Sequence, residues 1–132
     1  MTLLFIFSVV LLHIIDDFIL QQLGNLNNFK QKKFWEPYNK EYNNRYAADY
    51  QMGLIIHCIS WGIMVHLPLF FFSNTPEMVI LISFLIHSVI HGIIDNYKCN
   101  KYKLSLVEDQ ILHFIQLICI IWIGICFVLP SA

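Results

Sequence analysis

Four apolar stretches dominate this sequence and restrict what it can fold into. They cover residues of about 3–22, 51–72, 78–96 and 109–129. Each is close to the ~20 residues that an α-helix needs to cross the hydrocarbon core of a bilayer. Because no water is available in that core, the backbone groups of each span must be hydrogen-bonded within a helix. The sequence therefore predicts an all-α fold, an antiparallel up-down bundle of four transmembrane helices.

The composition agrees with a membrane protein. Of the 132 residues, 58% are hydrophobic and 13% are charged, whereas about a quarter of a soluble domain is charged. The spans leave too little chain for a separate soluble domain, so residues 1–132 are expected to form a single membrane domain. The first span is expected to stay in the fold, because it lacks the basic start of a signal peptide and contains His13, Asp16 and Asp17.

The basic side chains predict the orientation of the bundle. Five of them lie in the first loop and three in the third, and the other loop and both termini have none. By the positive-inside rule, loops one and three face the cytoplasm and both termini lie outside, in the inner (cytoplasmic) membrane. Membrane lipids are the expected partners of this basic surface, and nucleic acid is not expected. A homo-oligomer stays an open alternative.

Local patterns mark helix ends and a further helix. Gly24 fits a C-terminal cap of the first span, and Ser105 with Glu108 forms a capping box that predicts the start of the fourth. In the first loop, Tyr38, Tyr42, Tyr46 and Tyr50 recur every four residues and predict an aromatic stripe on an interfacial cytoplasmic helix. Such a helix would anchor the loop at the membrane surface or cover a site as a lid.

Ionisable residues recur as pairs inside the apolar spans. The pairs are His13 with Asp17, His91 with Asp95, and Asp109 with His113. A spacing of four residues places both members of a pair on one helical face. An ionisable group at membrane depth costs several kcal/mol, and it therefore indicates a functional site.

The expected topology brings these pairs to one depth. At ~1.5 Å per residue, we place His13, His57, His91 and His113 about 14, 9, 8 and 6 Å inside the cytoplasmic boundary. All four spans thus deliver polar groups to the same half of the membrane. His66 is the one histidine expected towards the outer half.

The carboxylates of this cluster need compensation. Asp16, Asp17 and Asp95 lie near the C-terminal ends of their spans, where the helix dipole disfavours negative charge. No Lys or Arg occurs within the expected spans, so a bound cation, protonation, a charged histidine or Lys98 reaching back to Asp95 must compensate them. Asp16 is about 100° round the helix from Asp17, and we expect only one of the two to point into the site.

A divalent metal ion would satisfy this set of groups. Imidazole and carboxylate ligands suit zinc, manganese or iron, and a position left for water would make the site catalytic. The candidate ligands are His13, Asp17, His57, His91, Asp95, Asp109 and His113, of which Asp109 and His113 are also the candidate catalytic residues. The candidates for orienting ligands or substrate are His87, Gln21, Lys98 and Gln110. A buried hydrogen-bond network and a proton or ion relay are the alternatives.

The order of these motifs resembles a known family. His13-x-x-x-Asp17-Phe18-x-x-Gln21, His91-x-x-x-Asp95-x-x-Lys98 and Asp109-Gln110-x-x-His113 are similar to the motifs of a family of small bacterial and phage membrane proteins, domain of unknown function 3307. The resemblance covers nearly the whole chain and supports the choice of residues, but it implies no established activity. The tyrosine-rich first loop is less typical of that family.

The leading functional expectation is a metal-dependent hydrolase acting on a phosphorylated or lipidic substrate, with an Asp or His that moves protons. A protein that binds or transports a metal ion or proton is the main alternative, and a non-catalytic membrane interaction protein is the third.

Overall fold

The computed structural model describes residues 2–23 and 26–128, and within these residues the chain is all-helical. Helix α1 (Thr2–Ile14) continues directly as a π-helix, η1 (Ile15–Leu20), and the other long helices are α4 (Asp49–Phe72), α5 (Glu77–Cys99) and α6 (Leu106–Val128). Two short helices, α2 (Leu26–Phe29) and α3 (Lys32–Glu41), lie between η1 and α4. Gly24, the predicted C-terminal cap, lies outside the described residues.

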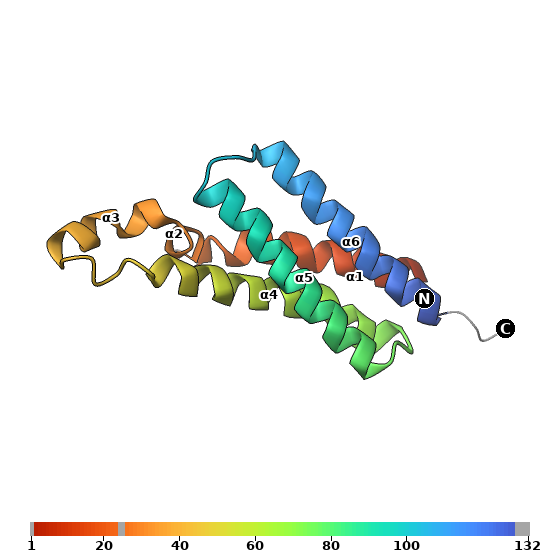
Figure 1. Cartoon of the computed structure of the whole chain (residues 1–132). Helices are drawn as coiled ribbons and strands as arrows, with labels where there is room; N and C mark the ends of the chain where they lie inside the picture. The colour runs from red at the N-terminus through yellow and green to blue at the C-terminus, as the bar shows by residue number, and fades with distance from the viewer. Residues whose placement is uncertain (1, 24–25, 129–132) are drawn as a thin grey trace.

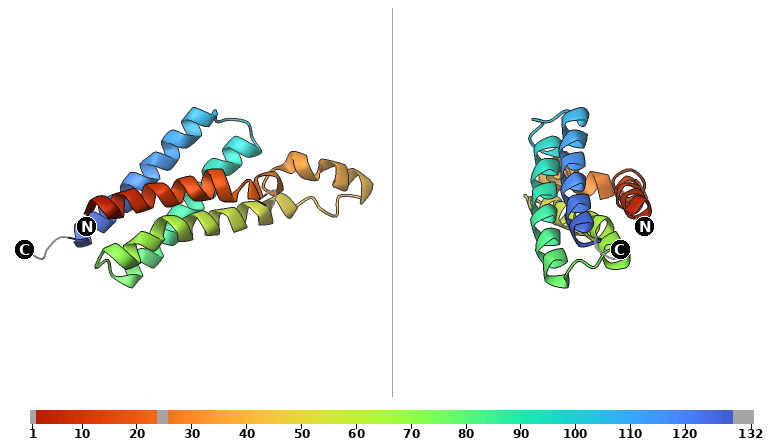
Figure 2. Two further views of the ribbon diagram at one scale, coloured as in Figure 1. Left: turned by 180° about the vertical axis from the view of Figure 1, so that it is seen from behind. Right: turned by 90° about the vertical axis from the view of Figure 1, so that its right-hand side faces the viewer.

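Successive long helices run in opposite directions, which confirms the predicted four-helix bundle (Figures 1 and 2). Four helices are long and apolar enough to cross a membrane, over residues 2–20, 49–72, 77–99 and 106–127. They match the predicted spans to within about one helical turn. One end of the bundle carries α2 and the connection from α5 to α6, and we call it the α2 end (Figure 1).

The capping box predicted at the start of the last span is present. The backbone N–H and the hydroxyl of Ser105 each donate to Glu108 Oε2 over 2.8 Å, and the Glu108 N–H donates back to Ser105 Oγ over 3.3 Å. These bonds satisfy N–H groups that the first turn of a helix leaves free. Helix α6 accordingly begins at Leu106, directly after the cap.

The predicted tyrosine stripe does not form one helix. Helix α3 ends at Glu41, and Asn43 and Asn44 follow with positive φ angles of 51° and 63°. Asparagine tolerates this left-handed conformation, which ends a helix. The chain therefore turns back, and the ring of Tyr46 stacks on Trp35 with 6.1 Å between ring centroids.

The core of the bundle lies towards the end opposite α2. It consists of Phe5, Val9, Trp61, Val65, Leu69, Ile80, Leu117 and Ile120. Large apolar side chains such as Leu3, Phe71 and Trp122 are mostly exposed on the outside of the helices. A surface this apolar would be unusual on a soluble monomer, and it is the surface expected of helices that face lipid.

Gly124 allows α6 to approach α1 closely. A Cβ atom at this position would lie 2.2 Å from Cζ of the buried Phe5 ring. We predict that Gly124→Ala lowers the free energy of unfolding by about 1–3 kcal/mol, because an overpacked core must shift its side chains. Chemical unfolding in detergent measures this loss.

Two further variants control this prediction. Phe5→Leu added to Gly124→Ala should recover part of the loss, because it removes the ring that the new methyl group meets. Gly92→Ala should cost less, because its Cβ would meet only the flexible end of the Cys58 side chain closely, at 2.7 Å. Equal losses for Gly92→Ala and Gly124→Ala would contradict the packing explanation.

Candidate metal centre

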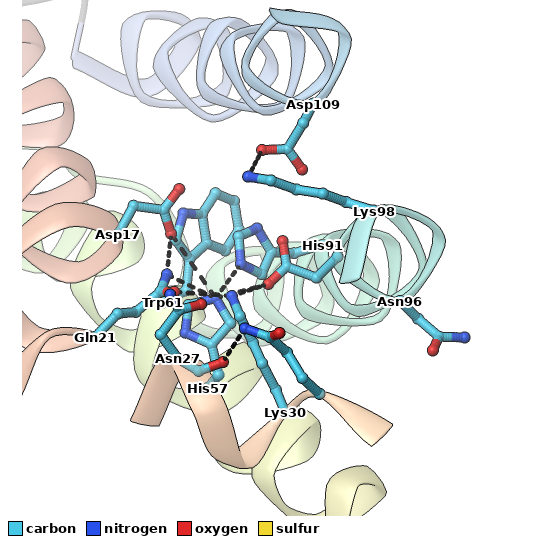
Figure 3. A network of polar contacts seen from close by, with 12 residues as sticks. Asp17, Gln21, Asn27, Lys30, His57, Trp61, His91, Asn96, Lys98 and Asp109 are labelled. Atoms are coloured by element: carbon cyan, nitrogen blue, oxygen red, sulfur yellow. Dashed lines mark hydrogen bonds and ion pairs between the residues drawn. The ribbon is translucent and has the colours of Figure 1, made fainter. Parts of the chain in front are cut away.

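A buried polar cluster fills the α2 end of the bundle (Figure 3). We call it the polar cluster, and it contains four aspartates, four histidines, a glutamine and two lysines: Asp16, Asp17, Asp95, Asp109, His13, His57, His91, His113, Gln21, Lys30 and Lys98. Every predicted metal ligand is among them. The convergence of four spans at one depth, predicted from the sequence, is therefore present.

His91 lies at the centre of the cluster. Its Nε2 atom is 2.9 Å from Nε2 of His57, and its Nδ1 atom is 3.2 Å from Nδ1 of His113. The Trp61 ring stacks on the His91 ring with 4.1 Å between centroids, and the Trp61 indole N–H donates to His13 Nδ1 over 2.9 Å. Trp61 thus fixes the orientation of two histidines at once.

Asp95 connects α5 to three other elements. Its Oδ2 atom lies 2.5 Å from the ammonium of Lys30, which directly follows α2, and 3.1 Å from His57 Nε2 of α4. Its Oδ1 atom lies 3.3 Å from His113 Nε2 of α6. His91, its expected partner one turn earlier, turns towards the other histidines instead.

Asp16 and Asp17 both face the site, and the expectation that only one of them would do so is wrong. Asp16 Oδ2 lies 3.6 Å from His57 Nδ1, and Asp17 Oδ1 lies 3.7 Å from His57 Nε2, so they flank one ring. The His57 ring lies between the two carboxylates, and both residues belong to the π-helix, in which the Gln21 N–H bonds the Asp16 carbonyl five residues back. This wider turn places successive residues at a smaller angle than an α-helix does.

Lys30 is the residue of the cluster that sequence reasoning missed. It lies in the first loop, yet only 4% of it is exposed, and its ammonium donates to Gln21 Oε1 and Asp95 Oδ2. Burial lowers the pKa of Lys30, but the adjacent Asp95 carboxylate outweighs this effect and raises the pKa above its usual 10.5. Nothing in the local pattern marks Lys30, although the uncompensated aspartates required a cation.

Two features hold the backbone around Lys30 against the bundle. Gly53 of α4 lies directly beneath it, because a Cβ atom there would be 2.6 Å from the Phe29 carbonyl oxygen. At the end of α5, the side chain of Asn100 donates to the Lys30 carbonyl over 3.0 Å and accepts from the Lys32 N–H over 2.7 Å. The chain from Phe29 to Lys32 is thus held between α4 and the end of α5.

Lys98 and Gln110 both contact Asp109. The Lys98 ammonium lies 2.5 Å from Asp109 Oδ2, so Lys98 does not pair with Asp95, the partner considered from the sequence. The Gln110 amide donates to the same oxygen over 3.1 Å. The other carboxylate oxygen, Oδ1, lies 3.4 Å from His113 Nε2.

His87 lies apart from the polar cluster. Its Nδ1 atom is 3.1 Å from Ser83 Oγ, which is 2.9 Å from Nε2 of His66. His66 therefore has polar partners in its own half of the bundle, which sequence reasoning did not identify. We call His66, Ser83 and His87 the second polar string.

The charges of the polar cluster do not balance. Four buried carboxylates face two ammonium groups, which leaves two negative charges uncompensated when the histidines are neutral. Uncompensated charge is costly to bury. One divalent cation or two protonated histidines would balance it.

The donor atoms suit a metal ion. Two groups of three residues each offer ligand atoms within 4.8 Å of one another: Asp17, His57 and His91, and His91, Asp95 and His113. Ligand atoms about 2.0–2.1 Å from a tetrahedral metal lie about 3.3 Å from each other. His113 Nε2 lies 3.3 Å from Asp95 Oδ1 and 3.4 Å from Asp109 Oδ1.

Two of these atoms also lack a well-formed hydrogen bond. His113 Nε2 and Asp109 Oδ1 are both buried and have no hydrogen-bond partner among the described residues. Buried polar atoms without partners are rare and suggest a missing ion or water. His13, whose Nε2 atom is also without a partner, belongs to neither group of three.

The chain matches no protein-family model, no curated protein and no solved structure. Its assignment to the family of domain of unknown function 3307 therefore stays a prediction.

The pair of Lys30 and Asp95 gives a stability test. We predict that Lys30→Met, measured with a chelator present, lowers the free energy of unfolding by about 3–5 kcal/mol, because it leaves a buried carboxylate uncompensated. Adding Asp95→Asn should recover most of this loss by removing the charge. Lys33→Met, at an exposed position of α3, should change stability by less than about 0.5 kcal/mol. A loss that Asp95→Asn does not reduce would contradict the pairing.

Proposed function

We propose that this protein is a membrane-embedded, metal-dependent hydrolase whose polar cluster holds a divalent metal ion. The charge deficit of the cluster, together with the buried His113 Nε2 and Asp109 Oδ1 atoms that form no hydrogen bond among the described residues, is the observation that carries the proposal. Zinc, manganese and iron all accept imidazole and carboxylate ligands. A metal in this position would supply Lewis-acid chemistry for activating a water molecule.

A pocket borders one side of the cluster. It has a volume of about 430 Å³, opens at the α2 end and is lined in part by Asp17, Asp95 and Asp109. A buried cluster that served only to hold the helices together would not need such a pocket. The pocket favours a catalytic site over a purely structural hydrogen-bond network.

The residues of the cluster divide into three roles. His57, His91, Asp95 and His113 are the central ligands, with Asp17 and Asp109 at the edges of the set. Trp61 and Gln21 orient ligands, through the stack on His91 and a 2.9 Å bond to Asp17. Asp109 borders the pocket and contacts His113, so this pair is placed to move a proton between substrate and cluster.

We further propose that the α2 end faces the cytoplasm of a bacterial cell, with both termini outside. The lysines around the pocket and in α3 support this orientation through the positive-inside rule.

Metal content tests the proposal. The purified protein should contain a divalent metal by elemental analysis, and His91→Ala and Asp95→Asn should lose most of it. His66→Ala should keep it, because His66 belongs to the second polar string. Hydrolysis of phosphate esters and lipids should stop when a chelator removes the metal.

Lys30→Met sharpens this test. It should bind the metal at least about tenfold more tightly than the parent, because the ion no longer competes with the ammonium for Asp95. A parent protein that folds stably and takes up no metal would contradict the proposal.

A proton or ion relay is the second candidate, and the second polar string favours it. His66, Ser83 and His87 extend buried polar groups into the half of the bundle opposite α2, and His66 borders a pocket that also contains Glu77. Among the described residues, however, no hydrogen bond joins this string to His91. Proton flux into liposomes that falls with His66→Ala and His87→Ala would favour the relay, and the hydrolase predicts no such flux.

A further inference from the structure

The pocket beside the polar cluster has a charge that depends on the metal. Its lining includes Asp17, Asp95 and Asp109 and two lysines, Lys30 and Lys98, so it carries one excess negative charge without an ion. A divalent cation on the cluster would cancel this excess, and with Asp16 counted it would leave the cluster and its pocket neutral. An anion would be repelled in the first state and not in the second.

Each of the two lysines pairs with a carboxylate that would also be a ligand of the metal. The Lys30 ammonium donates a hydrogen bond to Asp95 Oδ2, and the Lys98 ammonium donates one to Asp109 Oδ2. A metal that shares these carboxylates draws negative charge away from the ammonium groups and weakens their pairing. Lys98 is the more accessible of the two, because 31% of its side chain is exposed whereas only 5% of the Lys30 side chain is.

The remaining lining fits an anion with an apolar part. Gln22, Asn27 and Gln31 supply amide groups that can donate to phosphate oxygens. Phe18, Tyr102 and Leu106 supply an apolar side, and all three are exposed on the outside of the bundle. The pocket thus places two cationic side chains and amide donors next to a surface that faces lipid.

Resting on the proposed metal site, we propose that this pocket binds a phosphate group, with Lys98 as its main contact, and that it does so only when the metal is bound. The metal comes first because it would remove the excess negative charge and weaken the pairing of Lys98 with Asp109. The phosphate would then be held by Lys98, beside Asp109. The proposed hydrolase would accordingly act on phosphorylated substrates.

Calorimetric titration tests this inference on the full chain in nanodiscs of phosphatidylcholine, loaded with Zn²⁺ or Mn²⁺, whichever it retains. The titrants are inorganic phosphate, dihexanoyl phosphatidic acid and dihexanoyl phosphatidylcholine. Phosphate should bind to the loaded protein and not after chelation. Tighter binding of the phosphatidic acid than of inorganic phosphate would identify a lipid phosphate as the ligand. Equal binding of the two would identify free phosphate as the ligand. The phosphatidylcholine, whose phosphate is blocked by choline, should not bind.

Three variants at full metal loading assign the contact. Lys98→Met should weaken phosphate binding about tenfold or more, because it removes a charge-assisted hydrogen bond. Lys98→Arg keeps the charge and should retain binding. Lys103→Met removes a lysine of the same connection that does not line the pocket, and it should have no effect.

The outcomes separate this inference from the proposed function. A protein that retains metal but binds no phosphate would overturn the phosphate site and leave the metal centre standing. Equal phosphate binding with and without metal, or equal effects of Lys98→Met and Lys103→Met, would also overturn it. A protein that takes up no metal would overturn both proposals.

Discussion

The burial of the Asp95 carboxylate is the constraint on which the α2 end of this bundle depends. A charge at that depth persists only if other groups compensate it, and here those groups come from three separate segments: Lys30 before α3, His57 on α4 and His113 on α6. One side chain therefore sets the relative positions of four elements. The apolar core at the other end packs the helices together, but apolar contacts alone would not fix their rotation around a common polar centre.

Much of this arrangement could be predicted from the sequence because hydropathy and four-residue spacing are local signals. They identified the spans, the pairs such as Asp109 with His113, and the common depth of the polar groups. The missed features depend on geometry that spacing does not encode. Asp16 and Asp17, both in the π-helix, lie at opposite nitrogens of the His57 ring, a placement that the angle between neighbouring residues did not reveal. Lys30 reaches Asp95 across 65 residues of sequence, through a loop that carries no motif.

A single deficit of positive charge links the two proposals. The cluster has more carboxylates than ammonium groups, which favours a divalent ion, and that ion would in turn make the neighbouring pocket more favourable for an anion. In this view Lys30 and Lys98 are not simply partners of aspartates. Their ammonium groups compensate the buried carboxylates before a metal ion binds. Once the ion is bound, the ammonium groups would be available to a second ligand.

The position of Lys30 also bears on how the protein is made. Lys30 precedes the second span in the chain, yet its carboxylate partner lies near the end of the third, and Asn100, which holds the backbone of Lys30, follows that span. The first two helices can therefore enter the membrane, with Gln21 and Gly53 already able to contact the segment between them, before the Asp95 carboxylate is present. The pair of Lys30 and Asp95 and the bond from Asn100 to the Lys30 backbone can form only after α5 has been inserted, which makes them late steps of assembly.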